Sequence, residues 1–391
     1  MKLPATYLET RRRAGAGIYL DHAATTPMLP GSIEAMLPFL GGSHANPSSP
    51  HAKGRAARRA IDDARDTVAE FLGCAPGELI FTSGGTESDN LAITGTSDDG
   101  AVVVSAVEHH AVLLPAERRH ARLCSVDANA LVDLAHLAEL LDDEVSLISV
   151  MAVNNEVGTI EPLDAVVALA RELAPRALLH CDAVQAAPWI DVAAATAGFD
   201  MVSISAHKFG GPTGVGALAV RDRARARLSP LQLGGAQEAE LRAGTENLAG
   251  IVAAGAAASE WGRRRASIVE RVRELRDRLE DALAGSLATV NVDRSARVSS
   301  ILPMNFSGVA TEELLMMLDK AGVEASAGAA CASGALLPSH VLLAMGLAEA
   351  EIEGSVRFSL GWSTTSQEID EAISLIRATV LSLAASESAR I

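Results

Sequence analysis

The sequence predicts an α/β fold, in which a large, mostly parallel sheet lies between helices and a smaller α+β part follows. Three observations predict this class. Short apolar runs alternate with helical patterns over residues 54–220, as expected of a sheet built from βαβ units. A long, charged, amphipathic pattern occupies residues 259–284. Beyond it, strand-like and helical patterns are mixed up to residue 385.

The strands expected in the large sheet are apolar on both faces, which is typical of strands buried between two helical layers. They are Leu79–Phe81, Ala101–Ser105, Val145–Met151, Ala177–His180, Met201–Ile204 and Val215–Val220. The clearest helix covers Gly54–Leu72. It carries Ile61, Ala64 and Val68 on one stripe, and Gly73 ends it.

The amphipathic pattern at Ser259–Ala284 predicts a long helix and a domain boundary. We therefore expect a large domain at 18–260 and a smaller α+β domain at 261–391, with the segment 1–17 as a candidate addition to the smaller one. The elements expected there are the strands Ser299–Phe306 and Ser355–Ser359, the helices Thr311–Ala321, His340–Met345 and Ser366–Ala385, and a Gly/Ala/Ser-rich loop around Cys331.

Composition excludes several classes of function. The chain has 33 basic and 49 acidic residues, and a net charge of −16 argues against nucleic-acid binding. Its four cysteines show no CxxC spacing, so neither a disulfide framework nor a metal site is expected, and a reducing cytoplasm fits. We expect no signal peptide, and no apolar run of about 18 residues predicts a membrane span.

Lys208 is one of only four lysines, and it closely follows the expected strand Met201–Ile204. Desolvation at a strand end lowers the pKa of a lysine and makes its amine nucleophilic. One use of such an amine is a Schiff base with pyridoxal 5'-phosphate (PLP). The alternative is an ordinary lysine that reaches out to solvent.

Asp182 occupies a similar place after the expected strand Ala177–His180. A carboxylate there can keep the pyridine nitrogen of PLP protonated. Because the 26 residues from Asp182 to Lys208 hold one helix and one strand, we expect both side chains at the same edge of the sheet.

A third feature is the strand, glycine turn and helix start at Leu79–Ser88. The free N–H groups of that helix start, near Gly85, and the Thr86 hydroxyl suit a phosphate group. The segment lacks the GxGxxG and GKS/T spacings of dinucleotide and P-loop sites.

Short motifs in a fixed order carry a resemblance over residues 19–373. They are Tyr19–Pro27, Asn46–Ser49, Phe81–Asn90, Glu108-His109, Val153–Thr159, Asp182–Gln185, Ser205–Gly211, Arg242–Asn247, Ala327–Cys331, Pro338–Leu342 and Arg357–Gly361. In these motifs the chain resembles the cysteine desulfurases, the NifS/IscS-like group of class V aminotransferase-like, fold-type I PLP-dependent enzymes. The resemblance implies a mostly parallel, seven-stranded sheet in the large domain.

The resemblance also implies the residues that bind PLP. Lys208 resembles the lysine that forms the Schiff base, and Asp182 resembles the partner of the pyridine nitrogen. His109 is similar to a histidine that stacks on the ring and moves protons. Asn155 and Gln185 resemble the pair near the ring hydroxyl.

Phosphate ligands and a dimer contact are implied in the same way. Thr86, beside Gly85, resembles a phosphate ligand, as do Ser205 and His207. Thr245 resembles a residue that reaches the cofactor of the other subunit in a homodimer.

The residues implied for substrate and sulfur lie further along the chain. Arg357 resembles the arginine that binds the carboxylate of L-cysteine as a planar fork, with Asn155 beside it. Cys331 resembles the nucleophile that takes up sulfur as a persulfide, in a loop of small residues that suits mobility. The chain departs from the family at Ala327 and Ala329, where serines are usual, and at Trp362.

Together these features predict a cytoplasmic cysteine desulfurase whose catalytic residues are Lys208, Cys331 and His109. It would release L-alanine and pass sulfur to an acceptor protein, for iron–sulfur cluster assembly or another thiolation pathway. The alternatives are a selenocysteine lyase or a class V aminotransferase on the same scaffold, and a sulfur-carrier or scaffold subunit with a vestigial PLP site.

Overall fold

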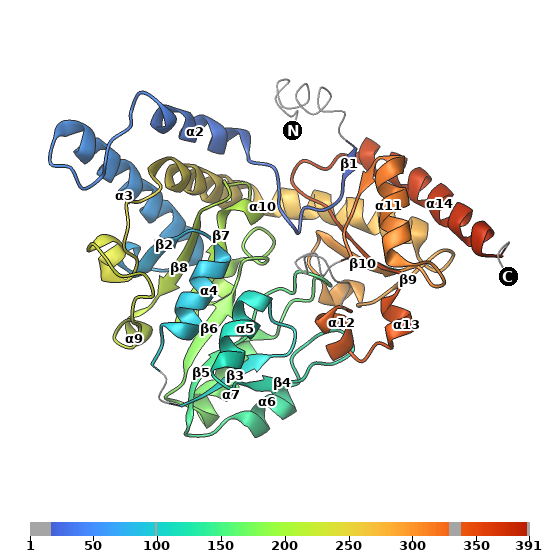
Figure 1. The fold of residues 1–391 in the computed structure, drawn as a ribbon, viewed down its shortest axis with the longest axis horizontal. Helices are drawn as coiled ribbons and strands as arrows, with labels where there is room; N and C mark the ends of the chain where they lie inside the picture. Colours follow the sequence, from blue (N-terminus) through green and yellow to red (C-terminus); the bar gives the residue numbers. More distant parts are fainter. Residues whose placement is uncertain (1–16, 98–99, 328–337, 389–391) are drawn as a thin grey trace.

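The computed structural model describes residues 17–97, 100–327 and 338–388. It contains the predicted large α/β part and a smaller α+β part beside it (Figure 1). The segment 1–16 and the loop around Cys331 lie outside the described residues. None of the helices in the described ranges is long and apolar enough to cross a bilayer.

The large sheet has seven strands in the order β2-β8-β7-β6-β5-β3-β4, and only β8 runs against its neighbours. They are β2 Leu79–Thr82, β3 Ala101–Ser105, β4 Arg122–Cys124, β5 Val145–Ser149, β6 Leu178–Asp182, β7 Met201–Ser205 and β8 Gly216–Val220. The six predicted strands are confirmed, with ends shifted by up to two residues. Strand β4 was not predicted because it is a short edge strand with Leu123 exposed.

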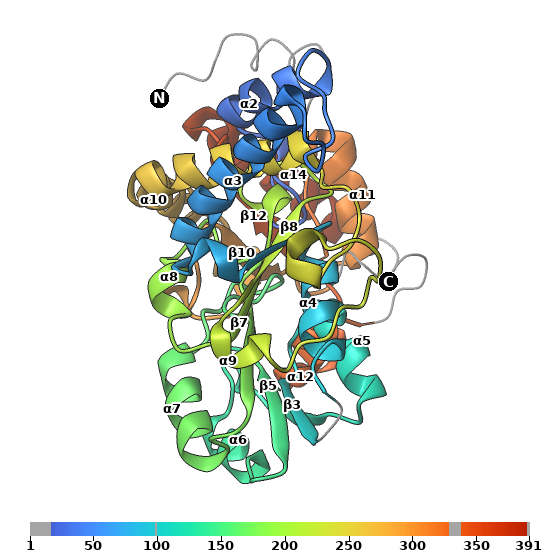
Figure 2. The ribbon, with the colours of Figure 1, turned by 90° about the vertical axis from the view of Figure 1, so that its left-hand side faces the viewer.

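Helices cover both faces of this sheet (Figure 2). Those on one face are α4 Gly85–Thr94 and α5 His110–Arg118, and those on the other include α7 Leu163–Leu173 and α8 Val192–Ala195. Side chains alternate between the two cores as strand geometry requires. Val103 belongs to one core, and Val102 and Val104 belong to the other. The shorter helices of this part are α6 Leu134–Leu140, α9 Asp222–Arg225 and the 3₁₀ turns Pro76–Glu78, Ala206–Lys208 and Gln237–Glu240.

Helix α10, Leu248–Leu283, runs behind the large sheet and on into the smaller part (Figure 1). It begins earlier than the predicted Ser259. The first half was not predicted because it is rich in alanine and glycine and lacks a polar face. These small residues let it approach α3, Ala52–Leu72. A Cβ added at Gly255 would lie 2.9 Å from the Ala64 Cβ. Helix α2, Pro30–Leu40, also packs on α10.

Two features of the structure concern the expected domain limits of 18–260 and 261–391. The expected boundary falls inside α10, a helix of 36 residues and about 54 Å, so one continuous helix joins the two parts. In addition, β1, Ile18–Tyr19, pairs with β11, Val323–Glu324. Residues 18–19 therefore contact the smaller part, although the large sheet follows them in the sequence.

The smaller part is built on a three-stranded antiparallel sheet in the order β12-β10-β9. Its strands are β9 Thr289–Val290, β10 Ile301–Asn305 and β12 Ser355–Ser359, and its helices are α11 Thr311–Ala321, α12 His340–Ala344, α13 Glu349–Ile352 and α14 Ser366–Ser388, with a 3₁₀ turn at Arg294–Ala296. The strands and helices predicted beyond residue 299 are confirmed.

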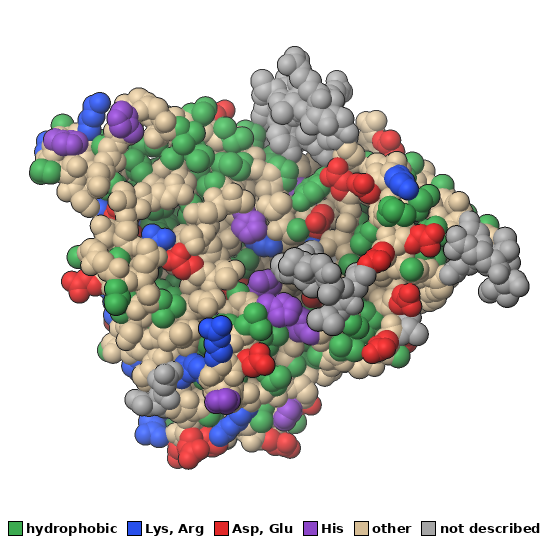
Figure 3. Space-filling view, in the orientation of Figure 1, with side chains coloured by type: hydrophobic (Ala, Val, Ile, Leu, Met, Phe, Trp, Pro, Cys, Tyr) green, Lys and Arg blue, Asp and Glu red, His purple; other side chains and the backbone are tan. Residues whose placement is uncertain are grey.

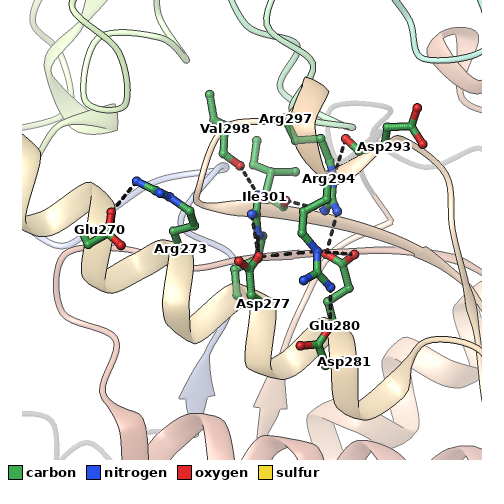
Figure 4. A network of polar contacts seen from close by, with 11 residues as sticks. Glu270, Arg273, Asp277, Glu280, Asp281, Asp293, Arg294, Arg297, Val298 and Ile301 are labelled. Carbon is green, nitrogen blue, oxygen red and sulfur yellow. Dashed lines mark hydrogen bonds and ion pairs between the residues drawn. The ribbon is translucent and has the colours of Figure 1, made fainter.

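A buried ion-pair network ties α10 to the loop before β10 (Figure 4). The side chain of Arg297 is fully buried, and its Nη2 lies 2.6 Å from Glu280 Oε2. Arg294 pairs with the same carboxylate but is 42% exposed. The backbone of this loop bonds the segment 158–160, since Val298 N–H donates to the Gly158 carbonyl. The network thus links the smaller part to a segment that adjoins the carboxyl edge of the large sheet.

We predict that Arg297→Ala lowers the free energy of unfolding by about 3 kcal/mol, because it leaves a buried carboxylate with a weaker partner and opens a cavity. The matched change at the exposed position, Arg294→Ala, should cost less than about 1 kcal/mol. Urea unfolding of both variants measures the difference. Equal losses would show that burial of Arg297 is not what gives the network its strength.

Candidate active site

A cavity of about 350 Å³ lies at the carboxyl edge of the large sheet, where the smaller part meets it. Segments that follow β2, β3, β5, β6 and β7 line it, together with β12 and the turn after β1. The lining residues are Ala23, Ala24, Gly85, Thr86, Asp89, His109, Met151, Val153, Asn155, Asp182, Val184, Gln185, Ser205, His207, Lys208 and Arg357. The fold therefore brings together all the predicted cofactor and substrate residues except Thr245.

Lys208 lies in the short 3₁₀ turn that follows β7. Its Nζ donates to the carbonyl of Ala23 at 2.5 Å and to that of Ala24 at 2.9 Å. The amine is thus directed into the cavity and held there by the turn at residues 21–26. This geometry does not match a strand-end lysine that reaches out to solvent.

Asp182 is the last residue of β6, and it is 5% exposed. Its Oδ1 accepts a hydrogen bond from Val184 N–H at 2.8 Å. Burial raises the pKa of Asp182 to about 6, although the Val184 N–H and the Lys208 charge act in the opposite direction. A buried carboxylate of this kind gains most from a cationic partner in the cavity.

Asp89 also lines the cavity, and we did not predict it. It lies on α4 and is 1% exposed, and its Oδ1 has no hydrogen-bond partner among the described residues. Burial raises the pKa of Asp89 well above its ordinary value, and the nearby Asp182 adds to the effect. The sequence offers one signal for its burial, because Asp89 lies beside Ser88 and two residues before Leu91 in a helix that buries all three.

The N-terminus of α4 lines one end of the cavity. A Cβ at Gly85 would lie 2.7 Å from Val184 Cγ2, so glycine lets the helix begin here. The side chains of Thr86, Ser205 and His207 lie around this helix start. Burial lowers the pKa of His207 to about 4, with a further contribution from Lys208. Free N–H groups, hydroxyls and a neutral imidazole suit an anion such as phosphate.

His109 precedes α5, and its Nδ1 accepts the N–H of Ala111 at 3.1 Å. The neutral ring therefore carries its proton on Nε2. Burial lowers the pKa of His109 to about 4, and Lys208 and His110 add to this shift. The rings of His110 and His340 lie next to it, with centroids 4.7 Å apart. Figure 3 shows histidines gathered at the centre of this face.

Arg357 enters from β12 in the smaller part and is 3% exposed. Its Nη1 donates to the backbone carbonyl of Asn155 at 2.8 Å, and its Nη2 lies 2.7 Å from Asp21 Oδ1. On the sheet side, the side-chain Oε1 of Gln185 accepts no hydrogen bond within the described part of the chain. The cavity thus holds a cation, an amine, buried acids and an anion cradle within one space.

One predicted residue, Thr245, lies outside the cavity, and another is not among the described residues. Thr245 is exposed and lines a separate hollow of about 120 Å³ with Arg242 and Glu246. Cys331 lies outside the described residues. Burial raises the pKa of the three described thiols, of Cys74 to about 11, of Cys124 to about 12 and of Cys181 well above its ordinary value.

Residues 18–372 match the family model described as aminotransferase class-V, and the chain belongs to this family. It is 40% identical over 369 residues to a putative cysteine desulfurase, IscS 1, of Bacillus subtilis, which spans 91% of this chain and 96% of that protein. Among solved structures it is similar to a NifS-like protein, with a TM-score of 0.87, 32% identity and coverage of 94% of this chain and 99% of that one.

A third match is a structure described as SspA in complex with cysteine, with a TM-score of 0.77, 32% identity and coverage of 89% of this chain and 99% of that chain. With these relatives, the chain falls among the NifS/IscS-like cysteine desulfurases within the class-V family. The resemblance stated from the motifs is confirmed, and so is the fold-type I architecture.

We predict that Asp89→Asn stabilises the protein at pH 8 but not at pH 4. The raised pKa means that the folded protein keeps a proton which the unfolded chain loses above a pH of about 4, so stability falls as the pH rises. Asparagine has the same shape and does not titrate. Thermal unfolding midpoints at both pH values measure the effect, with the exposed Asp62→Asn as the control. An Asp89→Asn variant that loses stability equally at both pH values would contradict this account.

Proposed function

We propose that the chain is a cysteine desulfurase that removes sulfur from L-cysteine, releases L-alanine and holds the sulfur as a persulfide on Cys331. The observation that carries this proposal is the cavity itself. Lys208, Asp182 and Arg357 come from three separate segments and line one space of about 350 Å³, in a chain whose relatives are named cysteine desulfurases.

The residues of the cavity fit PLP as the cofactor. Asp182 would hold the pyridine nitrogen, while Thr86 at the start of α4 and Ser205 and His207 beside it would hold the phosphate. The unpartnered Oε1 of Gln185, within the described structure, is suited to a donor on the ring. When bound, PLP supplies an electron sink for the α-carbon of an amino acid.

Two side chains would act on the substrate, one by binding its carboxylate and one by moving a proton. The Arg357 guanidinium presents a planar fork of N–H donors to the carboxylate of L-cysteine. The Lys208 amine, which donates to two backbone carbonyls, would in its neutral form remove the α-proton and later return a proton to the product. His109, neutral over the physiological pH range because its pKa is lowered to about 4, would lie against the cofactor ring and pass protons.

Sulfur transfer is assigned to Cys331. Its thiolate attacks the substrate sulfur, so that a sulfur–sulfur bond forms while the bond from sulfur to Cβ breaks. The electron pair left on carbon takes up a proton, and L-alanine leaves. One thiol and one cysteine thus give one persulfide and one alanine, and no oxidant is needed. The other thiols are unsuited to this attack because burial raises their pKa values.

The persulfide then passes to a sulfur-acceptor protein, which serves iron–sulfur cluster assembly or another thiolation pathway. The cysteines Cys74, Cys124 and Cys181 are free thiols, and both thiols and persulfides persist best in a reducing compartment. We therefore propose that the enzyme acts in the cytoplasm.

We predict that Cys331→Ala keeps the visible absorption of the bound cofactor but forms no alanine or sulfide from L-cysteine, because it lacks the nucleophile. Cys74→Ala is the matched control and should turn over normally. Alanine production is measured by chromatography and sulfide by a colorimetric assay. Full activity in Cys331→Ala would overturn the assignment. Keto-acid-dependent amine transfer by the unmodified protein would identify an aminotransferase, and turnover confined to selenocysteine would identify a lyase.

We further infer that two copies pair through the face that carries Thr245. Leu231 is 48% exposed and Leu233 is 82% exposed. Gln232 Nε2 donates to the Ala243 carbonyl at 2.8 Å, so this apolar segment is tied to the one that carries Thr245. Leu231 also borders an open hollow of about 810 Å³ that shares Thr86 and His109 with the cavity. This hollow gives Thr245 of a second copy a route to the phosphate end.

Leu233→Asp should convert the pair to single chains of 40.5 kDa and weaken cofactor retention, because it places a charge in an apolar contact and withdraws Thr245 of the second copy. Light scattering measures the mass, and absorption measures the retained cofactor. Leu381→Asp, a change at another exposed leucine on α14, is the control and should remain paired. A single-chain mass for the unmodified protein would refute the pairing.

A further inference from the structure

One turn contacts both cationic side chains of the cavity. The carbonyls of Ala23 and Ala24 accept the two hydrogen bonds of Lys208 Nζ. Two residues earlier, the carboxylate of Asp21 forms the ion pair with Arg357, at 2.7 Å. Asp21 is therefore bound to the guanidinium that is assigned to the substrate carboxylate.

Backbone contacts fix Asp21 in this position. It forms a bridge to Ser359, which lies two residues after Arg357 on β12 and so points to the same face of that strand. His22 N–H donates to the Ser359 carbonyl at 3.1 Å, and Ala23 N–H donates to its Oγ at 2.9 Å. The Tyr19 hydroxyl also donates to the Asp21 carbonyl at 3.0 Å. The reach from Asp21 to Arg357 is thus set by the fold.

The charges of Asp21 and Arg357 affect how the site binds a substrate carboxylate. The Arg357 side chain is 3% exposed, and that of Asp21 is 21% exposed. A buried guanidinium requires an anionic partner, and Asp21 is that partner when no substrate is bound. The other arm of the fork is on the Asn155 carbonyl. A substrate carboxylate that approaches Arg357 therefore meets a cation that is already neutralised by a carboxylate.

We propose that Asp21 is an internal competitor for the substrate carboxylate and sets the affinity of the site for amino acids. The proposal rests on the proposed role of Arg357. Each substrate must share or displace the Asp21 carboxylate, and Asp21 recovers Arg357 when the product leaves. Because the same contact opposes both substrate and product, it weakens binding without entering the chemical step.

The test uses the holoenzyme with Asp21→Asn, which keeps the shape and the acceptor oxygen but removes the charge. We expect the KM for L-cysteine and the Kd for propionate, a carboxylate without amine or thiol, both to fall about fivefold, or about 1 kcal/mol, with a smaller change in kcat. Calorimetry measures propionate binding. Glu324→Gln, which removes a carboxylate from β11, and Asp21→Glu, which keeps the charge, are the controls and should show no gain.

Weaker or unchanged propionate binding in folded Asp21→Asn would overturn the proposal and show that Asp21 serves only to position Arg357. Asp21→Ser, which also lacks the charge, makes the same comparison if the asparagine variant does not fold. A failure of the proposed function is distinguishable, because the unmodified protein would then not consume L-cysteine, while propionate binding would still decide the role of Asp21.

Discussion

The enclosure of two cationic side chains by one cavity is the constraint on which the rest of the site depends. Arg357 is buried and Lys208 is half-buried, and a buried charge without a partner is strongly destabilising. The turn at residues 21–26 solves this for both, with two carbonyls on Lys208 and the Asp21 carboxylate on Arg357. The turn can do so because β1, which pairs with β11, leads into it. On the other side, Ser359 of β12 accepts a hydrogen bond from the backbone of the turn.

The order and direction of the strands bring the remaining groups of the site together. Parallel strands end at a common edge, so residues that follow β2, β3, β5, β6 and β7 converge there regardless of their spacing in the sequence. The smaller part must then deliver Arg357 to that edge. Helix α10 spans both parts, and the Arg297–Glu280 pair holds the loop that bonds Gly158, close in sequence to Asn155 in the cavity.

Local patterns in the sequence predicted the features that depend on local structure. The buried strands, Asp182, Lys208 and the glycine turn before Thr86 follow from hydrophobic runs and the residues that end them. The resemblance supplied the residues that no local pattern reveals, such as Arg357 and Gln185. The contacts of Asp21 were not predictable, because its partner Arg357 is 336 residues away, and only the folded chain brings the two together. The first half of α10 was missed because a helix buried all around has no amphipathic stripe.

The net charge of −16 raises a difficulty that the cavity resolves locally. A strongly acidic protein repels anions such as a phosphate or a carboxylate, yet the proposed cofactor and substrate carry both. Asp89 and Glu108 are buried beside the cavity, and burial raises the pKa of each well above its ordinary value. Burial thus disfavours the charged form of both acids, which reduces the negative charge that faces Lys208 and Arg357. Burial of these acids in the wall thus helps an acidic chain to keep a site that suits anions.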